Sequence, residues 1–204
     1  MMMKKWYGLA AAVGMVLMGA VQTVQAADDY QTFGIRFRAV YVMPDESFDS
    51  RLNSLSPELS SNIIPELDLE YFFTKNFSSE LILGVTKLNI KLSNQTAGST
   101  YSLPPTLTLK YHPLAGNTIS PYIGFGMNVM VPFDSKLNGV SDFKIDPCVG
   151  WAAQAGTDIK VTDNIYFNLD YKYLNADTKA RIAGVKYKLD LNPHLFGIGV
   201  GYRF

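Results

Sequence analysis

The sequence predicts an all-β protein: an eight-stranded antiparallel transmembrane β-barrel with short periplasmic turns and longer extracellular loops. Three observations lead to this prediction, namely a C-terminal strand of outer-membrane type, an N-terminal export signal and regular alternation between them. The last segment, residues 194–204, carries large apolar or aromatic residues at every even position from Phe196 and ends on Phe204. Its opposite face is mostly glycine, as expected when the apolar side meets lipid and the small side meets a narrow interior.

The N-terminus has the features of a secretory signal peptide. Lys4 and Lys5 precede a short apolar stretch that ends in small residues at Ala26. That stretch is shorter than the roughly 20 apolar residues that a membrane-spanning helix needs. Residues 1–26 are therefore predicted to be a signal peptide that is removed, and residues 27–204 to form the barrel.

The composition argues against nucleic-acid binding and against an internal disulfide. Loss of Lys4 and Lys5 leaves 16 Lys and Arg against 18 Asp and Glu, so no basic surface for nucleic acid is expected. Cys148 is the single cysteine, and no internal disulfide can form.

Eight segments alternate between apolar residues and polar or small ones, with lengths that suit tilted membrane strands. They cover residues 33–43, about 65–73, 77–91, 103–111, 121–131, about 147–160, 164–174 and the C-terminal segment. The outward residues expected on the first four are Phe33, Ile35, Phe37 and Tyr41, then Leu67, Leu69, Tyr71 and Phe73, then Leu81, Leu83 and Val85, then Leu107, Leu109 and Tyr111. Those expected on the next three are Ile123, Phe125, Met127 and Val129, then Val149 and Trp151, then Ile165, Phe167, Leu169, Tyr171 and Tyr173.

The connections alternate in length, which sets the orientation of the barrel. Residues 74–76 and 161–163 are tight turns and 112–120 is of moderate length, whereas four long polar connections cover residues 45–63, 92–102, 132–146 and 175–192. Short turns are typical of the periplasmic end and long loops of the extracellular end. Aromatic residues gather at the predicted periplasmic rim as an interfacial girdle: Phe33, Phe72, Phe73, Phe77, Tyr111, Tyr122, Tyr202 and Phe204.

A soluble barrel of lipocalin type is the structural alternative, and it would place apolar residues inside and charges outside. Charges of both signs instead fall near one level of the predicted interior: Arg36, Arg38, Glu70, Glu80, Lys110, Asp158 and Arg203. Such a set can neutralise itself inside a membrane barrel and form a charged plug. The same charges are also explained if they simply fill the interior of a small barrel.

Nearer the extracellular end the inward positions become apolar, which predicts a cup open to the exterior. Its residues are Val40, Val42, Leu88, Pro104, Met130, Leu195 and Trp151. Trp151 faces lipid if alternation holds, and faces the cup if a bulge intervenes; Glu66 and Lys172 are charged exceptions at this level. Because an apolar solute can cross a charged plug only at a high cost in free energy, we expect a lateral exit through the wall.

Pro104 and Pro105 are the expected site of that exit, since proline cannot donate to a strand ladder. Alternatively, the two prolines only mark the upper end of a strand.

No arrangement of residues points to catalysis, a cofactor or a metal. His112 and His194 are predicted at opposite ends of the barrel. One cysteine, Cys148, and two distant histidines do not make a metal-ligand set. The chain is therefore not expected to be an enzyme.

Several stretches resemble the OmpW family of outer-membrane proteins across the whole mature chain. They are residues 38–44, 103–107, 121–126, 151–158 and 199–204. The resemblance implies an eight-stranded barrel in the outer membrane of a Gram-negative bacterium that passes small hydrophobic molecules. Expected partners are outer-membrane lipid, those solutes and the barrel-assembly machinery, which would meet the C-terminal strand ending in Phe204. A structural or receptor barrel that acts through its extracellular loops remains the alternative.

Overall fold

The computed structural model describes residues 30–51, 56–92, 95–140 and 142–204, so the predicted signal peptide lies outside the described residues. Strands dominate this part of the chain, and no helix in it is long and apolar enough to span a membrane. The strands are β1 (Phe33–Met43), β2 (Glu46–Phe48), β3 (Pro57–Leu59), β4 (Asn62–Thr74), β5 (Phe77–Gly84), β6 (Thr86–Leu92), β7 (Gln95–Leu103), β8 (Thr106–Tyr111), β9 (Ile119–Leu137), β10 (Phe143–Ile145), β11 (Cys148–Lys160), β12 (Ile165–Leu174), β13 (Ala176–Ile182), β14 (Val185–Leu191) and β15 (His194–Arg203).

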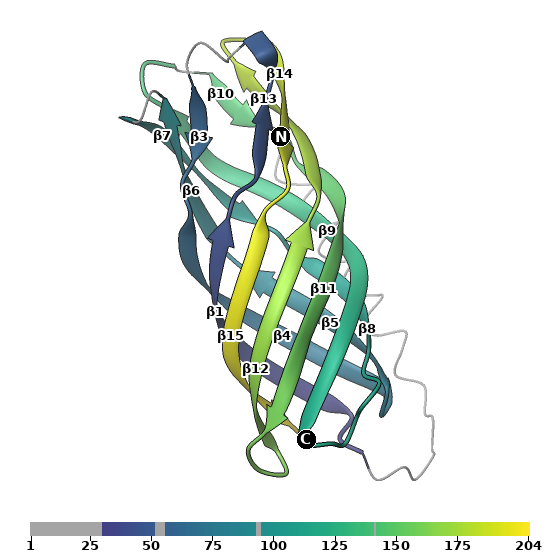
Figure 1. Ribbon diagram of the computed structural model, residues 1–204. Helices are drawn as coiled ribbons and strands as arrows, with labels where there is room; N and C mark the ends of the chain where they lie inside the picture. The colour runs from purple at the N-terminus through teal and green to yellow at the C-terminus, as the bar shows by residue number, and fades with distance from the viewer. Residues whose placement is uncertain (1–29, 52–55, 93–94, 141) are drawn as a thin grey trace, which may run out of the picture.

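Eight antiparallel strands close into a barrel, as the alternation predicts. Their order around the wall is β1, β4, β5, β8, β9, β11, β12 and β15, and β15 pairs back onto β1 (Figure 1). The backbone N–H of Phe33 donates to the Phe204 carbonyl at 3.1 Å, so the start of β1 and the C-terminus lie at the same end. The short turns also lie there, and this is called the short-turn end.

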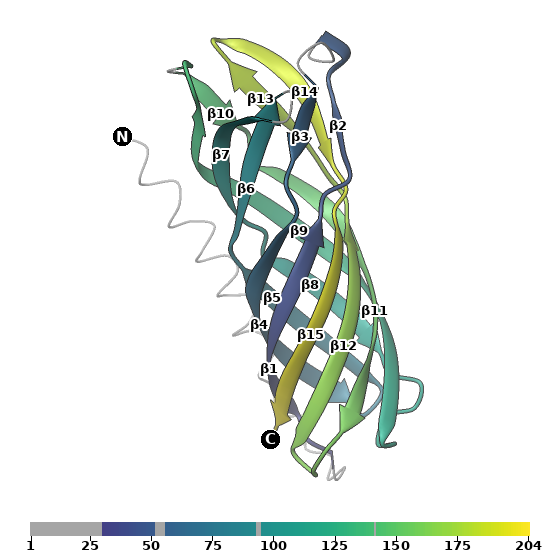
Figure 2. The same ribbon diagram turned by 60° about the vertical axis from the view of Figure 1, so that its left-hand side comes forward.

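The opposite end of the barrel is built from further strands. The β6–β7 hairpin, β3 and the upper half of β9 continue the wall, while β10, β13, β14 and β2 form a second sheet (Figures 1 and 2). The prediction that residues 45–63, 92–102, 132–146 and 175–192 are polar loops is wrong for much of their length, because they contain strands. Tyr187, Leu189 and Leu191 alternate with polar residues in β14, which is the strand pattern that was overlooked.

The two faces of the wall decide between a membrane barrel and a soluble one. Large apolar side chains point outward and stay exposed, among them Phe37 at 61%, Ile123 at 62% and Leu109 at 66%. The inward face carries charged residues that are almost fully buried. A soluble barrel would show the reverse arrangement, so the lipocalin alternative is excluded.

An aromatic girdle surrounds the short-turn end. Phe33 packs against Tyr71 with ring centroids 5.0 Å apart, and Phe77 packs against Tyr111 at the same separation. Phe72 and Tyr122 were predicted to belong to this girdle, but both point into the barrel and are buried. Each is preceded and followed by outward residues, so the strict alternation of a strand turns it inward.

The glycine face of β15 makes room for large inward side chains. A Cβ at Gly201 would lie 2.2 Å from the Tyr166 ring, and one at Gly199 would lie 2.7 Å from Cγ of Arg38. Bare backbone on this strand therefore lets the neighbouring residues fill the barrel axis.

Candidate functional site

The lower half of the interior holds an ion-pair cluster drawn from seven strands. Its charged members are Arg36, Arg38, Glu66, Asp68, Glu70, Glu80, Lys110, Asp158, Asp170, Lys172 and Arg203. All seven residues of the predicted plug belong to it. Nearly all of these side chains are shielded from solvent, and Arg203 at the short-turn end is the more accessible exception.

Arg38 lies at the centre of the cluster. Its guanidinium is within 3.0 Å of Glu66, 3.3 Å of Asp68, 3.0 Å of Glu80 and 3.1 Å of Asp170. These carboxylates come from three different strands, β4, β5 and β12. One arginine therefore ties opposite sides of the barrel together.

Neutral polar groups complete the network between the charges. The Tyr122 hydroxyl donates to Asp170 at 2.6 Å, and the amide of Gln154 donates to Glu80 and to Asp170 at 2.9 and 2.8 Å. Lys110 lies over the Tyr122 ring with Nζ 3.8 Å from its centroid. The charged and neutral polar side chains of the cluster therefore interlock across the interior of the barrel.

Two charged residues lie deeper in the barrel than predicted. Glu66 and Lys172 were assigned to the level of the apolar cup, but Lys172 pairs with Glu66 and Asp170 inside the ion-pair cluster. Barrel strands are staggered, so position along a strand is not height along the axis. In the β1–β4 ladder the residue opposite Glu66 is Arg38, so Glu66 lies at the level of the cluster.

An apolar layer lies next to the cluster on the side away from the short turns. It consists of Val40, Val42, Ile64, Ala152, Leu174 and Leu195, which pack together and are buried. This apolar layer is called the floor below. Val40, expected to line the cup, has no exposed surface and belongs to the floor.

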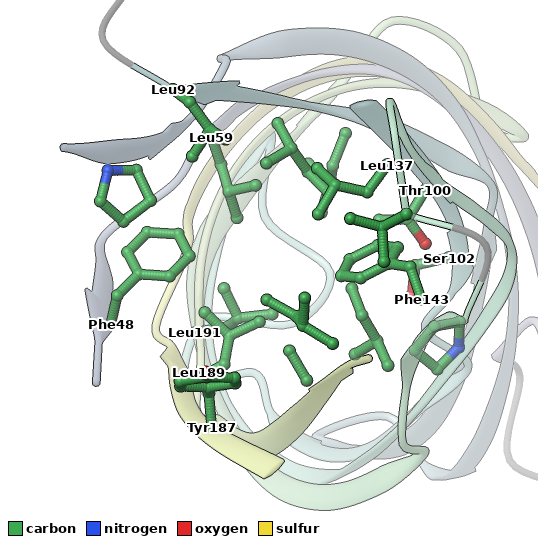
Figure 3. A pocket seen from close by; sticks show the side chains of 18 of the residues that line it. Phe48, Leu59, Leu92, Thr100, Ser102, Leu137, Phe143, Tyr187, Leu189 and Leu191 are labelled. Atoms are coloured by element: carbon green, nitrogen blue, oxygen red, sulfur yellow. The ribbon is translucent and has the colours of Figure 1, made fainter. Parts of the chain in front are cut away.

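Above the floor, the interior opens into two neighbouring apolar cavities. The larger one, here called the outer cavity, has a volume of about 320 Å³. Figure 3 shows the labelled side chains Phe48, Leu59, Phe143, Leu189 and Leu191 projecting into it from several strands. The smaller, lower cavity of about 60 Å³ shares Leu59, Leu88, Ser102, Met130 and Leu191 with the outer cavity.

Five of the predicted cup residues line the lower cavity: Val42, Leu88, Pro104, Met130 and Leu195. Much of the outer cavity was not anticipated, because half of its lining residues come from β2, β3, β10, β13 and β14, which were predicted to be loops.

Trp151 does not line either cavity. Alternation continues through β11 without a bulge, so its indole stays on the outer face, 41% exposed, beside Phe125 and Tyr173.

The wall is interrupted next to the lower cavity. β8 begins at Thr106 and β7 ends at Leu103, so Pro104 and Pro105 lie between two strands. On the neighbouring strand, Val85 separates β5 from β6 in the same way.

The histidines occupy opposite ends, as predicted. His112 lies near Glu70 and Ser78 beneath the ion-pair cluster, whereas His194 contacts the Tyr171 hydroxyl at the other end of β15. Within the described ranges, no group of three or more His, Cys, Asp or Glu residues is arranged to hold a metal ion.

A closed antiparallel barrel with an apolar outer face, an aromatic girdle and buried internal charge defines a bacterial outer-membrane β-barrel. The model of the OmpW family matches residues 31–204, and the chain belongs to that family. It is therefore located in the Gram-negative outer membrane, with its short-turn end on the periplasmic side.

Relatives and solved structures agree with this assignment. The chain is 37% identical to the uncharacterized outer-membrane protein y4mB of Sinorhizobium fredii over 83% of this chain and 79% of that protein. It is 34% identical to outer membrane protein W of Vibrio cholerae over 84% of this chain and 88% of that one. The crystal structure of OprG from Pseudomonas aeruginosa aligns with a TM-score of 0.76 and 27% identity, covering 85% of this chain and 96% of OprG.

Proposed function

We propose that the protein gives small hydrophobic molecules passive, non-enzymatic passage into the outer membrane, from the extracellular cavities out through the barrel wall. The observation that carries this proposal is an apolar cavity that opens at the extracellular end and stops at a packed floor above buried ion pairs. A solute can gain from leaving water for the cavity, at roughly 25 cal/mol per Å² of apolar surface.

The barrel axis is a poor exit for such a solute. Each charge in the cluster has a close partner of opposite sign, and separating buried partners costs about 3–5 kcal/mol. An apolar molecule offers those charges no replacement. Sideways escape above the cluster avoids this cost.

The interrupted wall supports a lateral exit. β4 pairs with β5 as far as Glu66 opposite Gly84, and above that point residues 62–65 form a ladder with β1 but not with β6 among the described residues. The Asn62 side chain donates to the Lys87 carbonyl at 3.0 Å across this gap. Pro104 and Pro105 offer no backbone N–H donor on the next strand, although the Pro105 carbonyl accepts the Val129 N–H at 3.0 Å. The exit proposed from the sequence thus gains a second boundary, at residues 62–65 and Val85.

Uptake of an apolar naphthylamine dye by Gram-negative cells that produce the protein tests the proposal. Met130→Asp puts a charge in both cavities and should abolish the protein-dependent rate, while Met130→Leu keeps an apolar side chain and should preserve it. Heat-modifiable gel mobility confirms that each variant forms a barrel. A dye rate no higher than in cells without the protein would refute passage and favour a receptor role for the loops.

The lateral exit is tested separately in the same assay. Replacing Pro104 and Pro105 with Thr restores two N–H donors and should slow uptake, because the wall can then pair across the break. Pro121→Thr, at the periplasmic end of β9, is the matched control. Uptake that is unchanged in the double variant contradicts exit beside the two prolines.

We further propose that the barrel-assembly machinery recognises β15 through Phe204. The Phe204 side chain is exposed on the lipid side, and β15 is paired with β1 along its whole length once the barrel has closed. Phe204→Ala should reduce the amount of folded barrel in the outer membrane but leave refolding into detergent unchanged. Equal amounts of the two proteins in the membrane would contradict this role.

A further inference from the structure

We propose that Thr86, Ser102 and Asn128 form a polar site in the lower cavity that selects amphiphilic solutes, those with a hydroxyl head on a small apolar body. The inference rests on the proposed passage of hydrophobic molecules and narrows their chemical class. These three residues are named the polar site below.

Two hydroxyls of the polar site lie side by side at the break in the wall. Thr86 is the first residue of β6, and Ser102 is directly opposite it in the β6–β7 ladder. Both point inward, with 7% and 2% of their surface exposed, and both line the lower cavity. Neither hydroxyl has a hydrogen-bond partner among the residues that the structure describes.

Asn128 contributes an acceptor to the same cavity. Its Nδ2 donates to the backbone carbonyls of Trp151 and Asn175, both at 3.3 Å. These two bonds fix the orientation of the amide, and Oδ1 is left without a donor in the described part of the chain. The side chain is 1% exposed and lines the lower cavity.

The hydroxyls next to the polar site do have partners, although some buried hydroxyls near the short-turn end, such as those of Ser120 and Thr157, also lack one among the described residues. Thr100, on the same strand as Ser102, is bonded to the Ser135 hydroxyl at 2.7 Å. Thr106, just beyond the prolines, donates to the Pro104 carbonyl at 3.1 Å. Buried polar groups are normally paired, and those that are not call for a partner from outside. The polar site is therefore the part of this wall prepared for a ligand.

The donor and acceptor pattern defines the head group. Asn128 Oδ1 can only accept, whereas the Thr86 and Ser102 hydroxyls can donate or accept. An alcohol can donate its proton to Asn128 Oδ1, or it can exchange a hydrogen bond with the Thr86 or Ser102 hydroxyl. An ether can only receive, and an alkane leaves every group of the site unpaired. The preferred order is alcohol, then ether, then alkane.

The position of the site links this preference to passage. Thr86 follows Val85 and Ser102 precedes Leu103, so the two hydroxyls flank the interrupted wall at the proposed exit. A solute whose head rests there has its apolar body among Leu88, Met130 and Leu195. It is then next to the opening through which it leaves.

Competition binding in lipid nanodiscs tests the inference, with the apolar naphthylamine dye as the reporter in the cavity. The competitors are n-heptane, 1-hexanol and methyl pentyl ether, which have equal numbers of non-hydrogen atoms, and each affinity is corrected for partition into empty nanodiscs. Relative to heptane, 1-hexanol should bind about three- to tenfold more tightly, the range expected for one net hydrogen bond. The ether should fall between them.

The double variant Thr86→Val and Ser102→Ala should remove most of this preference without weakening heptane. Thr100→Val, which changes a hydroxyl already bonded to Ser135, is the matched control and should keep the preference. Ser102→Ala alone provides a milder version if the double variant assembles poorly. Equal corrected affinities of the three competitors for the wild-type protein, as expected if water fills the site, would overturn the inference while leaving passage intact. If heptane itself fails to displace the dye, the proposed cavity function fails instead.

Discussion

Arg38→Met is the sharpest test of how the ion-pair cluster stabilises the barrel. The guanidinium has no exposed surface and lies within 3.3 Å of Glu66, Asp68, Glu80 and Asp170. Methionine keeps much of the aliphatic volume and removes the charge, so the measured effect is mainly electrostatic.

The size of the effect follows from which carboxylates lose their partner. Glu66 and Asp170 also pair with Lys172, and Glu80 also pairs with Arg36. In the described residues, Arg38 is the one cation within 4 Å of Asp68. The loss therefore resembles one broken buried pair, not four, and should lower the free energy of unfolding by about 3–5 kcal/mol.

Urea-induced unfolding in lipid vesicles, followed by gel mobility, measures this free energy. Adding Asp68→Asn to Arg38→Met removes the stranded carboxylate and should recover more than half of the loss. Arg51→Met removes an exposed pair with Asp49 and should leave stability unchanged within error. A loss below about 1 kcal/mol for Arg38→Met, or no recovery in the double variant, would refute this account of the cluster.

Three further predictions concern other parts of the molecule. Glu46 accepts the Leu59 N–H at 2.7 Å, and partial burial raises the pKa of its carboxyl group because the ionised form is disfavoured away from water. Ionisation therefore costs more in the folded state, so Glu46→Gln should increase hydrogen-exchange protection of the Leu59 amide at neutral pH. This difference should vanish below the ordinary carboxyl pKa of about 4.3, and a difference of the same size at low pH would contradict the reasoning. Trp151 is the sole tryptophan of residues 27–204, and its fluorescence should be quenched by lipids brominated on their chains but not by solutes in the cavity; the opposite result would place it inside. In planar bilayers the wild-type barrel should carry no measurable ion current, because the ion-pair cluster fills the axis, and steady conductance steps would show that an aqueous path remains.

Alternation along each strand was sufficient to predict which side chains face lipid and which face the interior. Trp151 illustrates this, since the unbroken period of two placed it outside and only an assumed bulge placed it in the cup. Phe72 and Tyr122 illustrate the converse, because grouping them with their aromatic neighbours ignored the same period. The physical rule was adequate in both cases where it was applied strictly.

The alternation pattern could not predict the depth of a residue in the barrel or the upper walls of the cavity. Relative height depends on the stagger between strands, which is a property of pairing partners far apart in the sequence, such as Arg38 and Glu66. The upper strands carry charged residues on their water-facing side, so β13 and β14 look like polar loops in composition. Their inward residues build the outer cavity only after they pair with each other and with β10 and β2.

The two halves of the interior place opposite demands on the same wall. Below the floor, arginine and lysine side chains connect β1, β8 and β12 to β4, β5 and β11, so moving one of these strands breaks buried ion pairs. Above it, apolar side chains line two cavities, and Pro104, Pro105 and Val85 interrupt the strands of the wall. The proposed lateral exit requires this division, because the barrel would have to open sideways without losing its shape. In that proposal the ion-pair cluster would close the axis and hold the lower strands in place while the wall above them opens.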